Sequence, residues 1–526
     1  MNLKPKLRAL LLATALAAPI PALADDLVIA TKSGPASMDP HFTATSANAE
    51  ATKQIFDTLL KSGNDLQIEP QLATEWKAID DTTWEFTLRE GVKFHDGSDF
   101  TAEDVKFSIE RIPNVTGPNP TTVYVRNVAG TEIVDPHTIR IKTHGPAPTL
   151  PNDFVRLFIV SHTAAADYST KETSAEGFNS GKATIGTGPY KFVSWAPTQD
   201  LVLEKFDGYW GGAQPWDKVT RKEIPNDAAR VAQLLAGQVD LISKIPATDL
   251  ASVEQDGALK LVKNPSAFIP YLEFDFREDT PQVWDNSGKK AEKNPFLDPR
   301  VREAFDLALD RETIIEFALE GMGVQATQLV TPSVFGYNKD IPEPVYDVDR
   351  ARALMAEAGY PEGFKVTLAY ANDRMPTELG PTVAQLLAAI DVKVDVQGVP
   401  ATVFNPAKTR GEYSLYMASW ATLTGESNYT LSALMHTNEP EKSQGAFNVR
   451  GYSNPKMDEL IEAAAAEMDE TKRKALLEEA NKLVATERPD LPLAINVSAW
   501  GMKADKVTYD PRADEDTVAM DVHPVK

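Results

Sequence analysis

Apolar and polar residues alternate most regularly in the stretch from residue 72 to residue 111. Between residues 84 and 88 every second residue is Trp, Phe or Leu, and this two-residue period predicts a half-buried strand. An Asp-Gly pair at 96–97 then predicts a turn, and Thr-Ala-Glu-Asp at 101–104 predicts a capped helix start. An apolar stripe follows on one face of this helix, and its members are Val105, Ile109 and Ile112.

Two further stretches have the apolar spacing of helices. One begins at the Asp-Pro pair 298–299 and is predicted to continue to a C-cap at Gly321. The other lies between residues 455 and 487 and is followed by a strand-like segment at 493–497. Strand and helix patterns alternate along the chain without an internal repeat, which predicts a mixed α/β protein.

The length of the chain implies more than one hydrophobic core. It has 526 residues, of which 42% are hydrophobic. A single core stops growing at about 250 to 300 residues. We therefore expect two or more large lobes.

The N-terminus has the layout of a secretory signal peptide. Basic residues precede a Leu- and Ala-rich run at 9–18, and Ala-Leu-Ala at 22–24 gives the pattern that signal peptidase recognises. A membrane anchor is the alternative, but it would need about 20 apolar residues to cross the bilayer. We expect residues 1–24 to be removed after Ala24, which gives a periplasmic protein that is not embedded in the membrane.

Cysteine is absent, and acidic residues outnumber basic ones by 76 to 53. Without cysteine the chain has no disulfide, no thiolate metal site and no Cys nucleophile. It also lacks the lipidated Cys that anchors many exported binding proteins. The net charge of −23 repels phosphate backbones and anionic lipids, so we expect no nucleic-acid partner.

Sequence motifs of known catalytic sites are also missing. The chain has no Gly-x-Ser-x-Gly, no His-Glu-x-x-His and no complete phosphate-binding loop. Its seven histidines are scattered, without a pair four residues apart. We therefore expect no catalytic residue, no metal site and no cofactor, although a metal site assembled from distant residues stays open.

The stretch at 72–111 closely resembles the signature of the family 5 extracellular solute-binding proteins, which serve peptide, nickel and related ABC importers. The matching residues are Ala73, Trp76, Asp80, Leu88, Arg89, Phe94, Asp96, Gly97, Thr101, Ala102, Asp104 and Val105. Similar blocks follow in the expected order at 37–40, 186–190, 209–212, 236–240, 298–302, 359–361 and 452–455. Most of these residues have structural roles in turns and helix starts, so they identify the family without touching a ligand.

The resemblance implies an α/β, two-lobed periplasmic-binding-protein fold of type II, in its large peptide-binding class, with an additional subdomain. Lobe I would comprise residues 25–62, 181–262 and 490–526. The additional subdomain would be 63–180, and lobe II would be 263–489.

The same resemblance implies a monomer that captures a short peptide or peptide-like solute between the lobes. The solute would then pass to an inner-membrane ABC permease and its ATPase subunits. Nickel or another metal chelate, an opine and a saccharide are alternative ligands within the family.

Two charged residues are candidate ligand contacts by resemblance. In peptide binders of the family, a carboxylate after a Gly-Trp segment pairs with the peptide's α-amine. Here the Asp expected after Trp420 is missing, and Glu426 either replaces it or is a solvated turn residue. In the dipeptide-binding branch an Arg after a strand meets the ligand carboxylate, a role that suits Arg374 unless it pairs with Asp373 or Glu378.

Aromatic and turn residues complete the candidate set. Trp420, Tyr429, Trp500 and the turn formed by Ser37 and Met38 match by family position and chemistry. Aromatic walls bind varied side chains through contact area, and backbone groups can hold a peptide's main chain. A core position is the alternative for each of these residues.

Two functions of other classes stay open on the sequence alone. An exported hydrolase would release amino acids from di- and tripeptides, although no nucleophile motif supports it. A chaperone-like protein would prevent aggregation without saturable binding of a small ligand. The missing Asp after Trp420 leaves solute capture as the leading hypothesis and makes recognition of an α-amine its open question.

Overall fold

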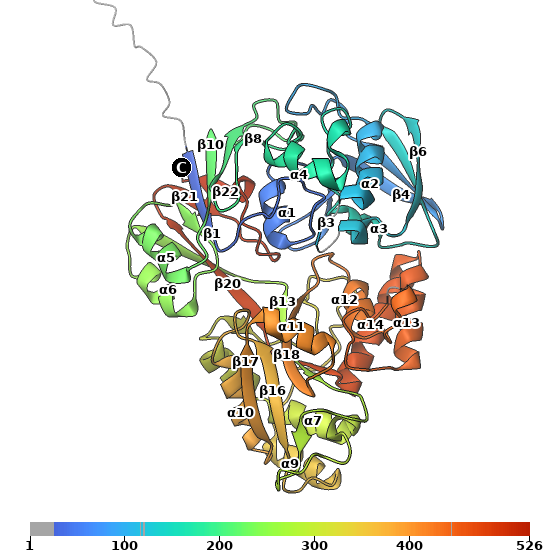
Figure 1. The fold of residues 1–526 in the computed structure, drawn as a ribbon, viewed down its shortest axis with the longest axis vertical. Helices are drawn as coiled ribbons and strands as arrows, with labels where there is room; N and C mark the ends of the chain where they lie inside the picture. Colours follow the sequence, from blue (N-terminus) through green and yellow to red (C-terminus); the bar gives the residue numbers. More distant parts are fainter. Residues whose placement is uncertain (1–25, 116, 119–120, 443, 526) are drawn as a thin grey trace, which may run out of the picture.

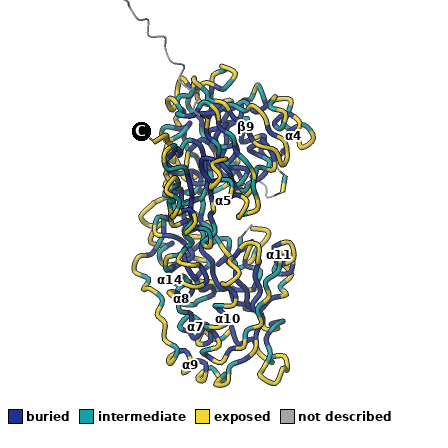
Figure 2. Tube along the Cα trace, turned by 90° about the vertical axis from the view of Figure 1, so that its left-hand side faces the viewer, coloured by how far each residue is buried: buried dark blue, intermediate teal, exposed yellow. Residues whose placement is uncertain are grey.

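The computed structural model describes residues 26–115, 117–118, 121–442 and 444–525. The predicted signal peptide, with cleavage after Ala24, lies outside these residues. The described chain forms an upper and a lower lobe in the view of Figure 1, each with a buried interior (Figure 2). Among the described helices, none has the length and apolar character needed to cross a membrane.

An eight-stranded mixed sheet forms the centre of the upper lobe. Its strands, in order, are β12 (Leu259–Pro265), β20 (Ile495–Lys503), β11 (Leu241–Ile242), β1 (Asp26–Thr31), β10 (Lys218–Glu223), β9 (Leu201–Lys205) and β8 (Tyr190–Ser194), and β15 (Gly323–Val324) pairs with β20. Strand β1 is parallel to β10 and β11, and the other neighbours are antiparallel. Apolar residues of β1, β9 and β20 pack into one core under this sheet.

A four-stranded antiparallel sheet lies on the right of the upper lobe in Figure 1. Its order is β4 (Ala73–Asp80), β5 (Thr83–Leu88), β7 (Thr138–Thr143) and β6 (Val128–Asp135). The predicted strand is β5, and the predicted capped helix is α2 (Ala102–Val115). At the start of α2 the backbone N–H of Thr101 donates to Asp104 at 2.9 Å. The stripe of Val105, Ile109 and Ile112 is buried, as predicted.

A six-stranded mixed sheet forms the centre of the lower lobe. Its order is β14 (Val283–Trp284), β16 (Lys365–Ala371), β18 (Leu415–Ala421), β13 (Phe268–Phe274) and β19 (Asp490–Pro492), and β17 (Lys393–Val399) pairs with β16. Strands β16 and β18 are parallel, with Leu368 opposite Leu415. Their carboxyl ends therefore lie at the same edge of the sheet.

Helices and two short hairpins surround these sheets. Those of the upper lobe, besides α2, are α1 (Ser46–Thr52), α3 (Leu150–Phe154), α4 (Lys171–Asn179), α5 (Asp227–Leu235) and α6 (Ala247–Glu254). Those of the lower lobe are α7 (Pro299–Ala308), α8 (Arg311–Thr313), α9 (Val348–Glu357), α10 (Leu379–Ala388), α11 (Ala401–Thr409), α12 (Ser427–Leu434), α13 (Pro455–Ala466) and α14 (Glu470–Glu487). The hairpins are β2 (Leu60–Ser62) with β3 (Ile68–Pro70), and β21 (Val507–Tyr509) with β22 (Val522–Pro524).

Two short connections link the central sheets of the two lobes, one from β12 to β13 and one from β19 to β20, and the chain reaches the upper sheet a third time where β15 pairs with β20. The backbone N–H of Ser266 donates to the carbonyl of Asn496 at 2.8 Å, and that of Leu493 donates to Pro270 at 2.9 Å. These bonds hold the two connections side by side. A pair of short strand-to-strand connections is a suitable hinge, because a few residues can absorb the backbone rotation of lobe closure.

The prediction of one helix from residue 298 to Gly321 is wrong in its length. Helix α7 ends at Ala308, and Asp310 starts the next helix by accepting the backbone N–H of Glu312 at 3.1 Å. A capping Asp inside an apolar pattern ends the first helix, because its side chain bonds the backbone in a non-helical conformation. The predicted helical region at 455–487 is confirmed and consists of α13 and α14.

Candidate ligand-binding site

The two lobes touch along one side of the molecule, where α3 and the β2–β3 hairpin of the upper lobe lie above α12 (Figure 1). The Asn152 side chain donates to the carbonyl of Thr424 at 2.7 Å, and Gln67 donates to the carbonyl of Ser333 at 2.5 Å. Gly425 has φ +74°, and a Cβ at this position would lie 2.5 Å from the carbonyl oxygen of Leu66. The lobes are therefore closed on each other at this contact.

An aromatic shelf on the lower lobe consists of Trp420, at the end of β18, and Tyr429, on α12. Their rings are stacked, with centroids 5.4 Å apart and an interplanar angle of 27°. The indole N–H of Trp420 donates to Thr430 at 2.9 Å, which fixes the orientation of the ring. Tyr429 is 37% exposed. The shelf can therefore offer an aromatic surface to a solute between the lobes.

Glu426 lies between the two shelf residues in sequence and is buried. Its carboxylate is 3.3 Å from the Nε of Arg473. Burial raises the pKa of Glu426 to about 7, an effect that the charge of Arg473 partly opposes. The sequence left open whether Glu426 is a solvated turn residue. The structure buries it in the loop that touches the upper lobe, where its carboxyl group is about half ionised near pH 7.

Four polar side chains of the upper lobe lie within electrostatic reach of Tyr429: Tyr124, Arg126, Arg156 and Asp153. Although Tyr429 as a whole is 37% exposed, loss of water around its hydroxyl raises its pKa to about 12, and these four groups add smaller effects of both signs. Burial also raises the pKa of Asp153 to about 7, with Arg126 opposing and Glu426 reinforcing the shift. Acidic, basic and aromatic groups of both lobes therefore surround the same space.

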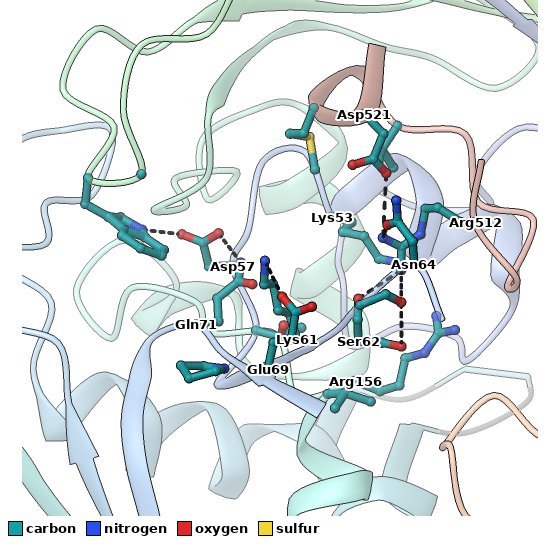
Figure 3. Close-up of a pocket in the computed structure, with 18 of the residues that line it drawn as sticks. Lys53, Asp57, Lys61, Ser62, Asn64, Glu69, Gln71, Arg156, Arg512 and Asp521 are labelled. Atoms are coloured by element: carbon teal, nitrogen blue, oxygen red, sulfur yellow. Dashed lines mark hydrogen bonds and ion pairs between the residues drawn. The ribbon is translucent and has the colours of Figure 1, made fainter. Parts of the chain in front are cut away.

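A cavity of about 770 Å³ opens in the upper lobe, and Arg156 is part of its wall (Figure 3). All of the described residues that line it belong to the upper lobe, and Lys53 and Arg512 are among them. At the far end, the Trp210 indole donates to Asp57 at 2.8 Å, and burial raises the pKa of Asp57. The cavity thus extends from Trp210 to the cationic side chains of Lys53, Arg156 and Arg512.

Arg374 lies just after β16, at the sheet edge where β18 leads to Trp420. It is exposed, and its side chain has no hydrogen bond or ion pair with the described residues. Neither of the alternative partners considered from the sequence holds it, since Asp373 instead accepts the backbone N–H of Ala401 at 3.0 Å. Ligands of α/β sheets commonly bind at the carboxyl ends of parallel strands, which is where this Arg lies.

Ser37, Met38 and Trp500 lie in the interior of the upper lobe, away from the aromatic shelf. The Ser37 hydroxyl donates to Asn179 at 3.1 Å, and Met38 has no exposed surface. Trp500 has none either, and its indole donates to Thr517 at 2.9 Å. The structure brings Trp420, Glu426 and Tyr429 together. It places Ser37, Met38 and Trp500 in packing positions instead.

One group of described residues could share a metal ion: His436, Glu439 and Glu462, whose ligand atoms lie within 4.8 Å of one another. The Lys442 ammonium is already 2.8 Å from Glu439 and 3.8 Å from Glu462. It neutralises the carboxylates that a cation would need. This group belongs to the lower lobe next to α13 and is not part of the shelf.

Sequence reasoning missed the upper-lobe side of the contact, which is Tyr124, Arg126, Asp153 and Arg156. These residues lie in segments without a matched family block. The available signal was the presence of two charged residues, Asp153 and Arg156, in the mostly apolar segment 150–160. It does not distinguish a binding residue from a surface one, because only the fold brings these side chains opposite Tyr429.

Comparison with known proteins identifies the chain's relatives. The model of the bacterial extracellular solute-binding proteins, family 5 Middle, matches residues 67–442. The glutathione-binding protein GsiB of Salmonella typhimurium is 30% identical over 498 residues, which cover 93% of this chain and 92% of GsiB. The periplasmic binding protein DppA of Helicobacter pylori, in complex with peptide STSA, is 25% identical with a TM-score of 0.73, covering 96% of this chain and 99% of DppA. CtaP of Listeria monocytogenes has a TM-score of 0.80 at 21% identity, covering 96% of this chain and all of CtaP, and supports the fold alone.

Proposed function

The chain belongs to the family 5 bacterial extracellular solute-binding proteins, and from this premise we propose that it captures a short peptide or peptide-like solute between its two lobes. The predicted family and type II fold are confirmed. The protein is the substrate-binding component of an ABC importer and works with a membrane permease and ATPase subunits. Two named relatives support the ligand class, since one binds glutathione, a tripeptide, and the other was solved with peptide STSA.

The observation that carries the proposal is the pairing of an aromatic shelf with charged groups across the lobe contact. Trp420 and Tyr429 form the shelf, and Asp153 and Arg156 lie on the opposite lobe. Apolar area can hold varied peptide side chains, whereas charged groups of both signs suit a peptide's two termini. A site of this composition tolerates peptides of different sequence but requires a charged amino terminus and a charged carboxyl terminus.

Capture follows from contact with both lobes. A solute that touches the shelf and the upper lobe together favours the closed state by its difference in affinity between the open and closed states. The permease can then distinguish loaded from empty protein by shape. In this proposal Glu426 receives the ligand's α-amine in place of the missing Asp, and Arg374 offers a positive charge at the rim.

The proposal also covers the absence of catalysis and the export of the protein. The relatives are transporter binding proteins, and we propose that this chain likewise performs no catalysis, with ATP hydrolysis confined to the importer's ATPase subunits. The family is extracellular or periplasmic. We propose that the mature protein begins after Ala24.

A thermal-shift series tests the ligand class. Glutathione and the peptide Ser-Thr-Ser-Ala are each added to the mature protein, with free glycine and free alanine as controls. A bound peptide present at about 100 times its Kd should raise the free energy of unfolding by about 2.7 kcal/mol. Stabilisation by a nickel chelate or a sugar, together with none by either peptide, would contradict the proposal.

A further inference from the structure

Arg156 is a largely buried cation without a partner among the residues that the structure describes. It follows α3 in the upper lobe and is only 9% exposed. Its guanidinium has no hydrogen bond and no ion pair with any residue that the structure describes, and Figure 3 draws none to it. A cation this largely buried normally has a paired and hydrogen-bonded counter-ion. No Arg156 nitrogen is among the fully buried described atoms that lack a partner, so the guanidinium meets the water of the cavity.

The carboxylates whose charge acts on Arg156, those of Asp516 and Asp514, are held by other cations. Arg512 binds Asp514 through two bonds of 2.9 Å each, and Lys53 lies 2.5 Å from Asp516. Burial alone would lower the pKa of Arg156, but the charge of Asp516 and of neighbouring acids outweighs it and raises that pKa. The side chain therefore stays charged while making no contact with these acids.

The position of Arg156 leaves it available to a solute. It is part of the wall of the 770 Å³ cavity, and it is also within electrostatic reach of Tyr429 on the opposite lobe. Asp153 precedes it by three residues in the chain, yet the two side chains form no ion pair. The free guanidinium thus faces the space where the cavity meets the lobe contact.

We propose that Arg156 is the receptor for the C-terminal carboxylate of a short peptide held between the lobes, an assignment that rests on the proposed function. A guanidinium matches a carboxylate through two parallel hydrogen bonds. The acids around Lys53 and Arg512 repel a dianion such as a phosphate, so a singly charged carboxylate fits better. Arg374 carries the same charge but is exposed, where solvent screens it. The larger loss of affinity is therefore expected from Arg156.

Calorimetric titrations of two probe pairs test this assignment. Each pair consists of a free acid and the corresponding amide. The first pair is Ser-Thr-Ser-Ala and its C-terminal amide, and the second is glutathione and its glycine amide. The variants are Arg156→Met, Arg374→Met and Arg89→Met. Arg89 is the matched control, because it lines the same cavity but is held by the Gln71 carbonyl at 3.0 Å and by the Trp210 ring.

Wild-type protein should bind a free-acid probe at least tenfold more tightly than its amide. Arg156→Met should reduce that preference to less than twofold by weakening the acid form alone, whereas Arg89→Met keeps it. Without ligand, Arg156→Met should unfold at the same or a higher temperature than wild type, because it removes an unpaired buried charge. A structural Arg would instead lower the unfolding temperature.

The outcomes separate this assignment from the proposed function. If wild type binds the acid and amide forms equally, or if Arg156→Met keeps the wild-type preference, the role of Arg156 is contradicted while peptide capture stands. If wild type binds no form of either probe, the proposed function itself fails, and the assignment fails with it.

Discussion

Glu426 shows how burial changes the behaviour of a single carboxyl group. Its pKa is raised to about 7 by loss of water, against an ordinary value of 4.5. Between these two pH values the folded protein holds a proton that the unfolded chain has already lost. The contribution of Glu426 to stability is therefore greatest at or below about pH 4.5 and is lost as pH rises toward about 7.

Replacement by Gln should remove this dependence. Between pH 4.5 and 7.5 the free energy of unfolding of the wild type should fall by up to about 3 kcal/mol because of Glu426. We expect Glu426→Gln to lack this part of the fall. Urea unfolding at several pH values measures it. Glu479→Gln, at an exposed position of α14, is the control and should follow the wild-type curve. Parallel curves for wild type and Glu426→Gln would show that the carboxyl titrates normally in the folded protein.

Single residues were the least predictable part of the site. Trp420 and Tyr429 could be proposed because a family segment marks their region, and the structure places them together. Asp153 and Arg156 could not, because a charged side chain between apolar ones has the same pattern on a surface and in a closed cavity. Trp500 and Met38 matched by position, but the sequence alone does not reveal whether such residues face a core.

The loop from Thr422 to Glu426 is the element that joins the lower sheet to the lobe contact. It connects β18 to α12, and Gly425 within it has φ +74°. The carbonyl oxygen of Leu66, on the upper lobe, occupies the space where a Cβ would project. The loop can therefore approach the upper lobe closely only with glycine at this position.

A methyl group at this position should interfere with closure. We expect Gly425→Ala to weaken binding of Ser-Thr-Ser-Ala at least tenfold, measured by calorimetry, because the closed state must separate the loop from Leu66. Gly91→Ala is the matched control: Gly91 has φ +73°, and no atom lies within 4 Å of a Cβ built there. Both variants bear the backbone strain of a positive φ, about 1 to 2 kcal/mol. Equal affinities for the two would mean that this contact does not take part in closure.

Elements with strong local signals were predictable from the sequence. The strand β5 and the capped helix α2 are confirmed because alternation and capping chemistry are set by neighbouring residues. The division between α7 and α8 was not foreseen. There the apolar spacing continues past Ala308, and the capping side chain of Asp310 ends the first helix in spite of it.

At the scale of the whole molecule, the two lobes and their mixed sheets were predictable from chain length, alternating patterns and family resemblance. The exact residue boundaries of lobe I, the additional subdomain and lobe II stay a prediction. The contact of α3 with the β18–α12 loop could not be foreseen, since it joins residues 272 positions apart. Such a contact depends on the rotation of the lobes about the paired connections, which leaves no local sequence pattern.

Native mass spectrometry of the protein purified from the periplasm of its own host tests the central claim most directly, because a solute held between closed lobes can survive purification. We predict a bound mass, or a ladder of masses, that fragments into amino acids and disappears after mild unfolding and refolding. A single bound sugar or a nickel chelate in its place would contradict capture of a peptide.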